Sequence, residues 1–343
     1  MKNWKWAWMI VLLIVPLMRA EPPQHQKKPL VGLPAWAYGF MSDSDPIQPD
    51  PQDSEARGGP DKGVMLHLAG SPLSFTFTQL RDQHGPADWF PNDHPPMPDI
   101  VAHGKKPNVT ACSFCHFPSG KGHPSNADIT DLPYSYFLQT MSDFKNGLRW
   151  SADTRKTNTN QMKVFANAMT EEEIQAVARY YGSIKWAPRI KVVETDMVPK
   201  MGFGGGMFFT LQGTEKEPLG DRIFETPESR EITVALRNPR SMFIAYAPVG
   251  SIKKGEAIVA AKQCRLCHGE NLQGTGPIPG IAGRSPSYLV RQLYDMQQGT
   301  RSGEWTSLMK PAVSNLTPDD FVAIGAYLAS RTLPSASATT ASN

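Results

Sequence analysis

Apolar residues recur at helical spacing in two stretches, one near the middle of the chain and one near its C-terminus. These positions are Ile174, Val177, Ala178 and Tyr181 in the first stretch, and Phe321, Ile324, Gly325 and Leu328 in the second. Thr170 and Glu173 open the first stretch with the spacing of a capping box, and Thr317 with Pro318 gives the second an N-cap followed by proline. We therefore predict a helix at each stretch.

These two helices close the two copies of an internal repeat. With an offset of 152 residues, SYFLQTMSDFKNG (135–147) aligns with SYLVRQLYDMQQG (287–299). Further along, an offset of 147 aligns Met162 with Met309 and Tyr180 with Tyr327. Residues 251–264 and 287–299 are amphipathic and predict two more helices. The repeat indicates a mainly α protein with two tandem helical domains, at residues 96–186 and 248–333.

The segments outside the repeat have other patterns. Residues 21–62 are polar and rich in proline, which predicts an extended or disordered segment. The following residues are more apolar and are expected to wrap around the first domain, so that 21–95 form an N-terminal extension. Residues 187–247 contain a few β-like runs and are too many for a bare hinge. We expect a long irregular, β-poor strap packed across both domains there, and a flexible tail at 334–343.

The N-terminus has the pattern of a secretory signal peptide, which we assign to residues 1–20. Lys2 and Lys5 form a positive region before an apolar run from Trp6 to Met18, and Ala20 offers a small residue for cleavage. The apolar run is shorter than the roughly 20 residues that a membrane-spanning helix needs. An uncleaved N-terminal anchor is the alternative, and either interpretation predicts export to the periplasm.

The charge of the chain argues against one class of partner. The formal net charge is +3, but the signal segment carries three basic residues and no acidic one, so the mature chain is neutral. The sequence contains no basic block or nucleic-acid motif. A neutral surface has no strong attraction for nucleic acid, and we expect none to be bound.

All four cysteines fall in two Cys-x-x-Cys-His motifs, at Cys112, Cys115 and His116 and at Cys264, Cys267 and His268. A four-thiolate zinc site does not explain the histidines, and a thioredoxin-like pair requires a βαβ setting that is not seen. Covalent attachment of haem explains every residue. Two thiols bond to the vinyl groups, and the next histidine binds the iron. The motifs therefore predict two haem c groups.

The repeat also selects one methionine in each copy, Met162 and Met309, as a candidate second iron ligand. Both are expected in a loop shortly before the last helix, and a thioether favours a higher reduction potential. Met169 is the rival in the first copy, but it aligns with Leu316, and Met141 aligns with Leu293, so both are interpreted as core residues. Three histidines of residues 71–104 are interpreted as surface residues or propionate contacts: His84, His94 and His103.

With both motifs, PGIAGRSPSYLVRQL and the LMKP segment, the chain resembles the two-haem, two-domain class I c-type cytochromes of bacterial periplasms over residues 100–186 and 248–333. The resemblance implies that the carbonyl of Pro279 accepts a hydrogen bond from the axial His268, which orients the ring. The first copy departs from the family pattern, because Ala127 stands where the second copy has this proline.

These features predict an electron-transfer protein and not an enzyme. A haem with histidine and methionine on its two faces has no open iron position and exchanges single electrons. The expected partners are redox proteins such as a dehydrogenase, an oxidase or another cytochrome, met in weak, transient contacts or through membrane association. Two alternatives remain, a dihaem peroxidase and a haem subunit of a membrane dehydrogenase or oxidase complex.

Overall fold

The structure is a computed structural model that describes residues 32–40, 63–204 and 207–333. The predicted signal peptide, most of residues 21–62 and the predicted tail lie outside the described residues. Within the described ranges, no helix combines the length and hydropathy needed to cross a bilayer.

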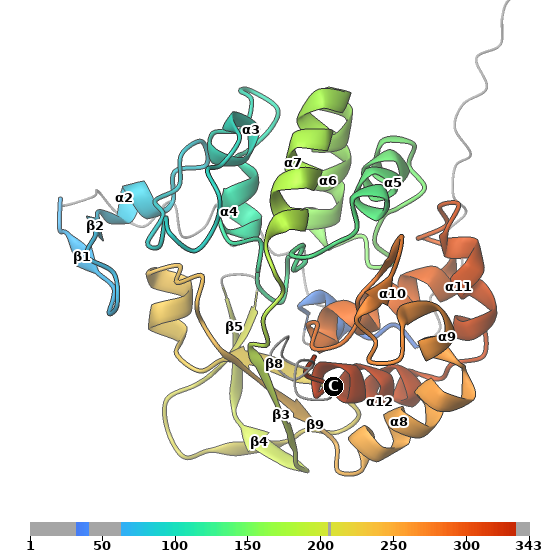
Figure 1. The fold of residues 1–343 in the computed structure, drawn as a ribbon. Helices are drawn as coiled ribbons and strands as arrows, with labels where there is room; N and C mark the ends of the chain where they lie inside the picture. The colour runs from blue at the N-terminus through green and yellow to red at the C-terminus, as the bar shows by residue number, and fades with distance from the viewer. Residues whose placement is uncertain (1–31, 41–62, 205–206, 334–343) are drawn as a thin grey trace, which may run out of the picture. The chain divides into compact units, whose positions relative to one another are not determined.

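Domain 1 is built from helices that surround one apolar core. Its elements are α3 (Asp99–Ala102), α4 (Cys112–His116), α5 (Tyr134–Lys145), α6 (Thr157–Ala168) and α7 (Glu171–Ser183). Helix α5 packs against both α6 and α7 (Figure 1). The predicted capping box of α7 is confirmed: Glu173 N donates to Thr170 Oγ1 at 3.2 Å, and Thr170 N donates to Glu173 Oε2 at 2.7 Å.

Domain 2 repeats this arrangement with a longer first helix. Its elements are α8 (Ser251–Ala261), α9 (Cys264–His268), the short strands β10 (Gly274–Thr275) and β11 (Ile278–Pro279), α10 (Pro286–Gln298), α11 (Thr306–Val313) and α12 (Pro318–Ala329). Helices α8 and α12 pack closely because Gly255 has no side chain (Figure 1). A Cβ atom there would lie 2.0 Å from the carbonyl oxygen of Ala323.

A part of the N-terminal extension belongs to the core of domain 2. Residues Ala35–Tyr38 form the 3₁₀-helix η1, which packs against α10. Tyr38 is 2% exposed, and its hydroxyl donates to the buried carboxylate of Asp295 at 2.8 Å. The prediction of an extended or disordered segment is therefore wrong for residues 32–40, because the apolar side chains of this segment pack into the core of domain 2.

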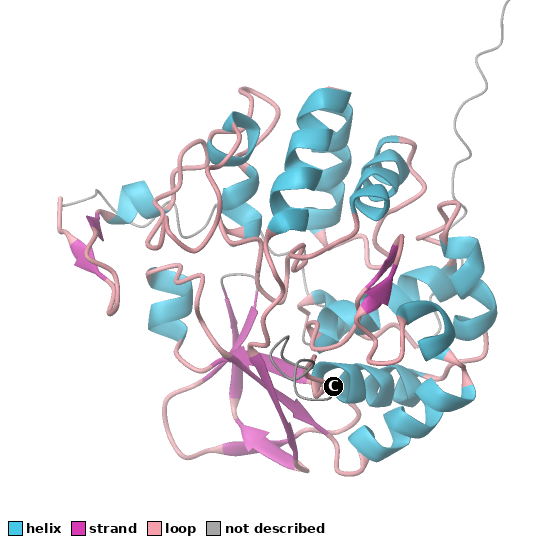
Figure 2. Ribbon diagram, viewed as in Figure 1, coloured by secondary structure: helices cyan, strands magenta, loops and turns pink. Residues whose placement is uncertain are grey.

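The strap contains more strand than the β-poor linker predicted from the sequence (Figure 2). Its strands are β3 (Ile190–Glu194), β4 (Met197–Pro199), β5 (Met201–Gly204), β6 (Met207–Thr210), β7 (Lys216–Pro218), β8 (Phe224–Pro227) and β9 (Phe243–Ala247). Strand β9 pairs in parallel with β3 and antiparallel with β8. Alternate residues of β9 are buried, and both β3 and β9 contact α12. This alternating burial stabilises strand where the sequence suggested irregular chain.

Two segments that are distant in sequence pack together against domain 1, and we call residues 63–98 and 229–240 the cover. They contain β1 (Leu66–His67), β2 (Ser74–Phe75), α2 (Phe77–Leu80) and the π-helix η2 (Glu231–Ala235). Trp89 is 1% exposed, and its indole N–H donates to the carbonyl of Leu236 at 2.6 Å. Arg240 and Asp93 form an ion pair at 2.6 Å between the two segments.

Candidate haem sites

Each Cys-x-x-Cys-His motif forms a single short helix, α4 in domain 1 and α9 in domain 2. The spacing places the cysteines three positions apart, about one turn, so that both thiols and the following histidine share one side of the chain. His116 Nδ1 lies 2.8 Å from the carbonyl oxygen of Ala127, and His268 Nδ1 lies 2.8 Å from that of Pro279. A carbonyl accepts only from an N–H, so each contact requires the proton on Nδ1 and leaves the Nε2 lone pair available to a metal.

Burial keeps both imidazoles in the form that a metal needs. Desolvation lowers the pKa of His116, and the hydrogen bond to Ala127 opposes it only in part. Desolvation likewise lowers the pKa of His268 against the opposing effect of Pro279. A neutral imidazole is the form that coordinates iron, so these environments favour a ligand role.

The two candidate methionines lie on helices, and the expectation of loops is wrong. Met162 lies in α6 and Met309 in α11. Pro311 suggests a loop in the sequence, yet it lies inside the short helix α11. Both methionines line a cavity that also contains His116 and His268. Met169, the rival of Met162, lines the same cavity, so the position of these side chains alone does not choose between them.

The cavity is continuous between the domains, and its central part is basic. Arg149 of domain 1 donates to the hydroxyl of Tyr288 of domain 2 at 3.0 Å, and Arg301 of domain 2 donates to the hydroxyl of Tyr136 of domain 1 at 2.9 Å. Both arginines also donate to Gln292 Oε1 at 2.9 Å. All five residues line the cavity. The two domains therefore exchange arginine–tyrosine contacts in a crossed, symmetric pattern.

This basic centre fits the acidic groups of haem. Arg149 and Arg301 are each 7% exposed, and within the described residues neither forms a salt bridge with a carboxylate. Arg301 Nε is buried, and no hydrogen-bond partner for it lies among the described residues. Burial alone would raise the pKa of Tyr136, but the charges of Arg301 and Arg149 lower it to about 8. Five basic side chains and two acidic ones line the cavity, so the site has a net positive charge that propionates would neutralise.

Sequence reasoning missed this arginine pair, although a signal was present. Arg149 and Arg301 are separated by the same offset of 152 residues that relates the two haem motifs. The backbones meet there as well, because Trp150 N donates to the carbonyl of Thr300 at 3.0 Å and Ser302 N donates to that of Leu148 at 2.8 Å. A repeat alignment extended through this segment would have found the pair but not its crossed contacts.

The histidines at positions 84, 94 and 103 each contact a neighbouring oxygen atom. His84 and His103 each approach the carbonyl of the other, at 3.0 and 3.2 Å, and His94 pairs with Asp88 at 2.9 Å. Across the described ranges, no cluster of three or more histidine, cysteine or acidic side chains could hold a metal ion. His103 is exposed, and His84 and His94 are partly exposed.

The cytochrome c family model matches residues 101–185 and 252–332. The chain is 23% identical over 230 residues to a thiosulfate dehydrogenase electron acceptor of Thiomonas intermedia, a match that covers 66% of this chain and 81% of that protein. It is 34% identical over 90 residues to cytochrome c4 of Pseudomonas aeruginosa, covering 26% of this chain and less than half, 41%, of that relative. The crystal structure of reduced cytochrome c4 from Pseudomonas stutzeri aligns with a TM-score of 0.42 and 18% identity, over 64% of this chain and 93% of the other.

Proposed function

The chain carries two tandem cytochrome c domains, and from this premise we propose that it is a periplasmic electron carrier whose two haems are each held between a histidine and a methionine. Covalently attached haem c is the cofactor of both domains. Bound in this way, haem supplies one-electron exchange between Fe(II) and Fe(III).

The side chains of each domain divide the work of holding the group. Cys112 and Cys115, and likewise Cys264 and Cys267, form the thioether bonds. His116 and His268 offer Nε2 because their Nδ1–H groups are bound to backbone carbonyls. Met162 and Met309 would supply a second ligand, a thioether sulfur that raises the reduction potential. Arg149 and Arg301 would bind the propionates.

This ligand set leaves no iron position for a substrate, which favours a carrier over a peroxidase. The single observation that supports it is that a histidine and the repeat-related methionine of both domains line one cavity. The shared cavity also brings both sites to one junction, so electrons can pass between domains inside the molecule.

Redox proteins of the periplasm are the proposed partners. The relative from Thiomonas intermedia, named as an electron acceptor of thiosulfate dehydrogenase, covers two thirds of this chain and favours a dehydrogenase as the electron donor. The signal-like N-terminus and the attachment of haem c outside the cytoplasm support the periplasm. Copurification with a large membrane complex would instead support the alternative of a permanent haem subunit.

Near-infrared spectroscopy of the oxidised protein tests the ligand set. We expect a methionine-to-iron charge-transfer band from both haems, and we expect Met309→Ala and Met162→Ala each to remove half of it. Met141→Leu is the matched control, because Met141 is buried and proposed as a core residue. If Met162→Ala left the band unchanged and Met169→Leu removed half of it, the ligand in domain 1 would be Met169.

Ligand binding and turnover test the function itself. The reduced protein is expected not to bind carbon monoxide at neutral pH, and the half-reduced protein is expected not to turn over hydrogen peroxide. Rapid binding of carbon monoxide by the folded protein, or peroxide turnover at an enzymatic rate, would contradict the carrier and support the peroxidase.

A further inference from the structure

The two haem motifs differ in how far they are exposed. Phe114 lies between the cysteines of domain 1 and is 3% exposed, whereas Leu266, its repeat counterpart in domain 2, is 81% exposed. Cys267 is exposed, while Cys115, its counterpart, is half-buried. The attachment residue Cys267 of domain 2 therefore lies at the surface, whereas its counterpart in domain 1 is partly covered.

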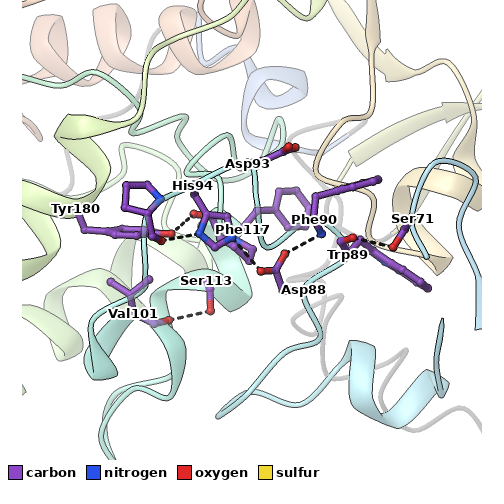
Figure 3. Close-up of polar contacts among 12 residues, drawn as sticks. Ser71, Asp88, Trp89, Phe90, Asp93, His94, Val101, Ser113, Phe117 and Tyr180 are labelled. Atoms are coloured by element: carbon purple, nitrogen blue, oxygen red, sulfur yellow. Dashed lines mark hydrogen bonds and ion pairs between the residues drawn. The ribbon is translucent and has the colours of Figure 1, made fainter. Parts of the chain in front are cut away.

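The cover closes the motif of domain 1. The guanidinium of Arg237 lies over the Phe114 ring, 4.6 Å from its centroid, and donates to the Phe114 carbonyl. The carbonyl of Gln83 in the cover accepts from Ala111 N at 2.9 Å, directly before the first cysteine. Figure 3 shows other contacts of the cover: the carbonyl of Trp89 accepts from the Ser71 hydroxyl, and His94 pairs with Asp88 close to Tyr180 of α7. The cover thus packs on the haem motif of domain 1, whereas the described residues leave the corresponding surface of domain 2 exposed.

The methionine side of domain 2 also presents an apolar residue to solvent. Leu308, next to Met309, is 71% exposed, whereas Gln161 stands at the corresponding place next to Met162. Charged residues near Leu266 and Leu308 in the sequence are of both signs, with Lys262, Arg265 and Glu270 around the first and Glu304 and Lys310 around the second. Exposed apolar residues among mixed charges suit a partner without strong charge complementarity.

We propose that domain 2 is the only port for electron exchange with protein partners and that domain 1 exchanges electrons through domain 2. The occupant of the port is a small redox protein with apolar side chains around its own metal site. The partner's reduced metal loses one electron, domain 2 gains it, and the same electron passes to domain 1, so no bond or proton changes place. The proposal rests on the electron-transfer function proposed above.

The test uses the full-length holoprotein and a reduced blue-copper protein with an apolar face as the probe. Stopped-flow absorbance follows the reduction of both haems by this probe. The port variants are Leu266→Glu, Leu308→Glu and the double variant, which place a charge in the contact. The matched control is Val164→Glu in α6 of domain 1, because Val164 is an exposed apolar residue, 54% exposed, close to Met162.

We expect the double variant to lower the bimolecular rate at least tenfold for the whole absorbance change, whereas Val164→Glu stays within twofold of the wild type. Adding salt should change the wild-type rate little, as the mixed charges require. The proposal is overturned if the double variant keeps its rate, if half of the absorbance keeps the original rate, or if Val164→Glu slows the reaction equally. It is also overturned if the wild-type rate falls steeply with salt.

A second measurement, reduction by dithionite, distinguishes failure of this proposal from failure of the carrier function. Dithionite, a small reductant, should reduce both haems of every variant as it does in the wild type, and unfolding temperatures should agree. If dithionite did not reduce the wild-type haems, or if air did not reoxidise them, the carrier function itself would be refuted. Normal behaviour with dithionite together with unchanged rates with the copper protein would refute only the single port.

Discussion

Domain 1 and domain 2 share one repeat, yet segments outside the repeat pack against them in different ways. Domain 2 has an eleven-residue first helix, α8, that packs along α12, whereas α3 of domain 1 has four residues. Residues Ala35–Tyr38 join the core of domain 2, whereas Trp89, Phe90 and Leu236 of the cover form an apolar cluster of their own. The cover contacts domain 1 through Arg237, whose guanidinium lies over the Phe114 ring of the haem motif. The comparison teaches that a segment outside the repeat can extend the core of one copy and cover the haem motif of the other.

The largest expected effect comes from removing the anchor of the cover. Trp89→Ala should lower the free energy of unfolding by about 3–5 kcal/mol, because it deletes a fully buried indole and leaves a cavity. Urea unfolding followed by haem absorbance measures the loss. Val64→Ala is the control, since Val64 lies in the same segment and is 59% exposed. A loss below about 1 kcal/mol for Trp89→Ala would mean that domain 1 does not depend on the cover.

The second effect is a pH dependence that belongs to domain 2. Burial raises the pKa of Asp295 to about 6, although the bonds from Ala152 N and Tyr38 and the charges of Arg291 and Arg149 oppose it. An aspartate in the unfolded chain titrates near pH 4, so between about pH 4 and 6 only the folded state retains the proton. The free energy of unfolding should therefore fall as the pH rises through this window, by about 2–3 kcal/mol in total.

Asp295→Asn tests this dependence because asparagine can still accept from Tyr38 and Ala152 but cannot ionise. Denaturant unfolding at a series of pH values should give a flatter profile for the variant in this window. Equal slopes for the variant and the wild type would show that another group carries the titration.

A smaller effect is expected where the two domains touch. Gly303 of domain 2 approaches the buried Asp143 of domain 1 so closely that a Cβ atom would lie 2.0 Å from its carboxylate. Gly303→Ala should cost about 1–3 kcal/mol by overpacking. The neighbouring, exposed Ser302→Ala should stay within about 0.5 kcal/mol. Thermal unfolding of both variants compares their stabilities. Equal unfolding temperatures would indicate that the contact between the domains can shift to accommodate the added methyl group.

The smallest effect concerns the threonine N-cap that begins the last helix of both domains. Thr170→Ala and Thr317→Ala each remove an N-cap hydroxyl that accepts a hydrogen bond from a backbone N–H of the first turn, and each should cost about 1 kcal/mol. The costs should add in the double variant because the caps lie in different domains. Urea titrations measure the free energy of unfolding of the two single variants and the double variant. If the two single costs differ by more than about 1 kcal/mol, the last helices of the two domains are not equivalent.

The sequence predicts the elements that repeat and misses those that join them. Both haem motifs, the two capping threonines and the helices around them follow from local spacing and a fixed offset. The helical setting of Met309 was missed because Pro311 resembles a loop signal, although a proline near the end of a short helix removes few hydrogen bonds. Local patterns are sufficient where stabilising contacts are themselves local.

Long-range contacts could not be found in this way. Arg237 covers Phe114 from 123 residues away, and Arg149 meets Tyr288 across 139 residues. Neither pair leaves a periodic pattern in the sequence, because each residue is chosen by a surface that exists only after folding. The strands of the strap were underestimated for the same reason, since β3 pairs with a strand some fifty residues later.

The bond between Tyr38 and Asp295 has a consequence for the order in which the molecule is made. The two residues are 257 positions apart, so Tyr38 cannot form this bond until most of the polypeptide has been synthesised. Tyr38 leaves the ribosome long before α10 emerges. The Ala35–Tyr38 segment is thus among the last to pack, and a chain truncated before Asp295 would leave this apolar segment open to proteases and chaperones.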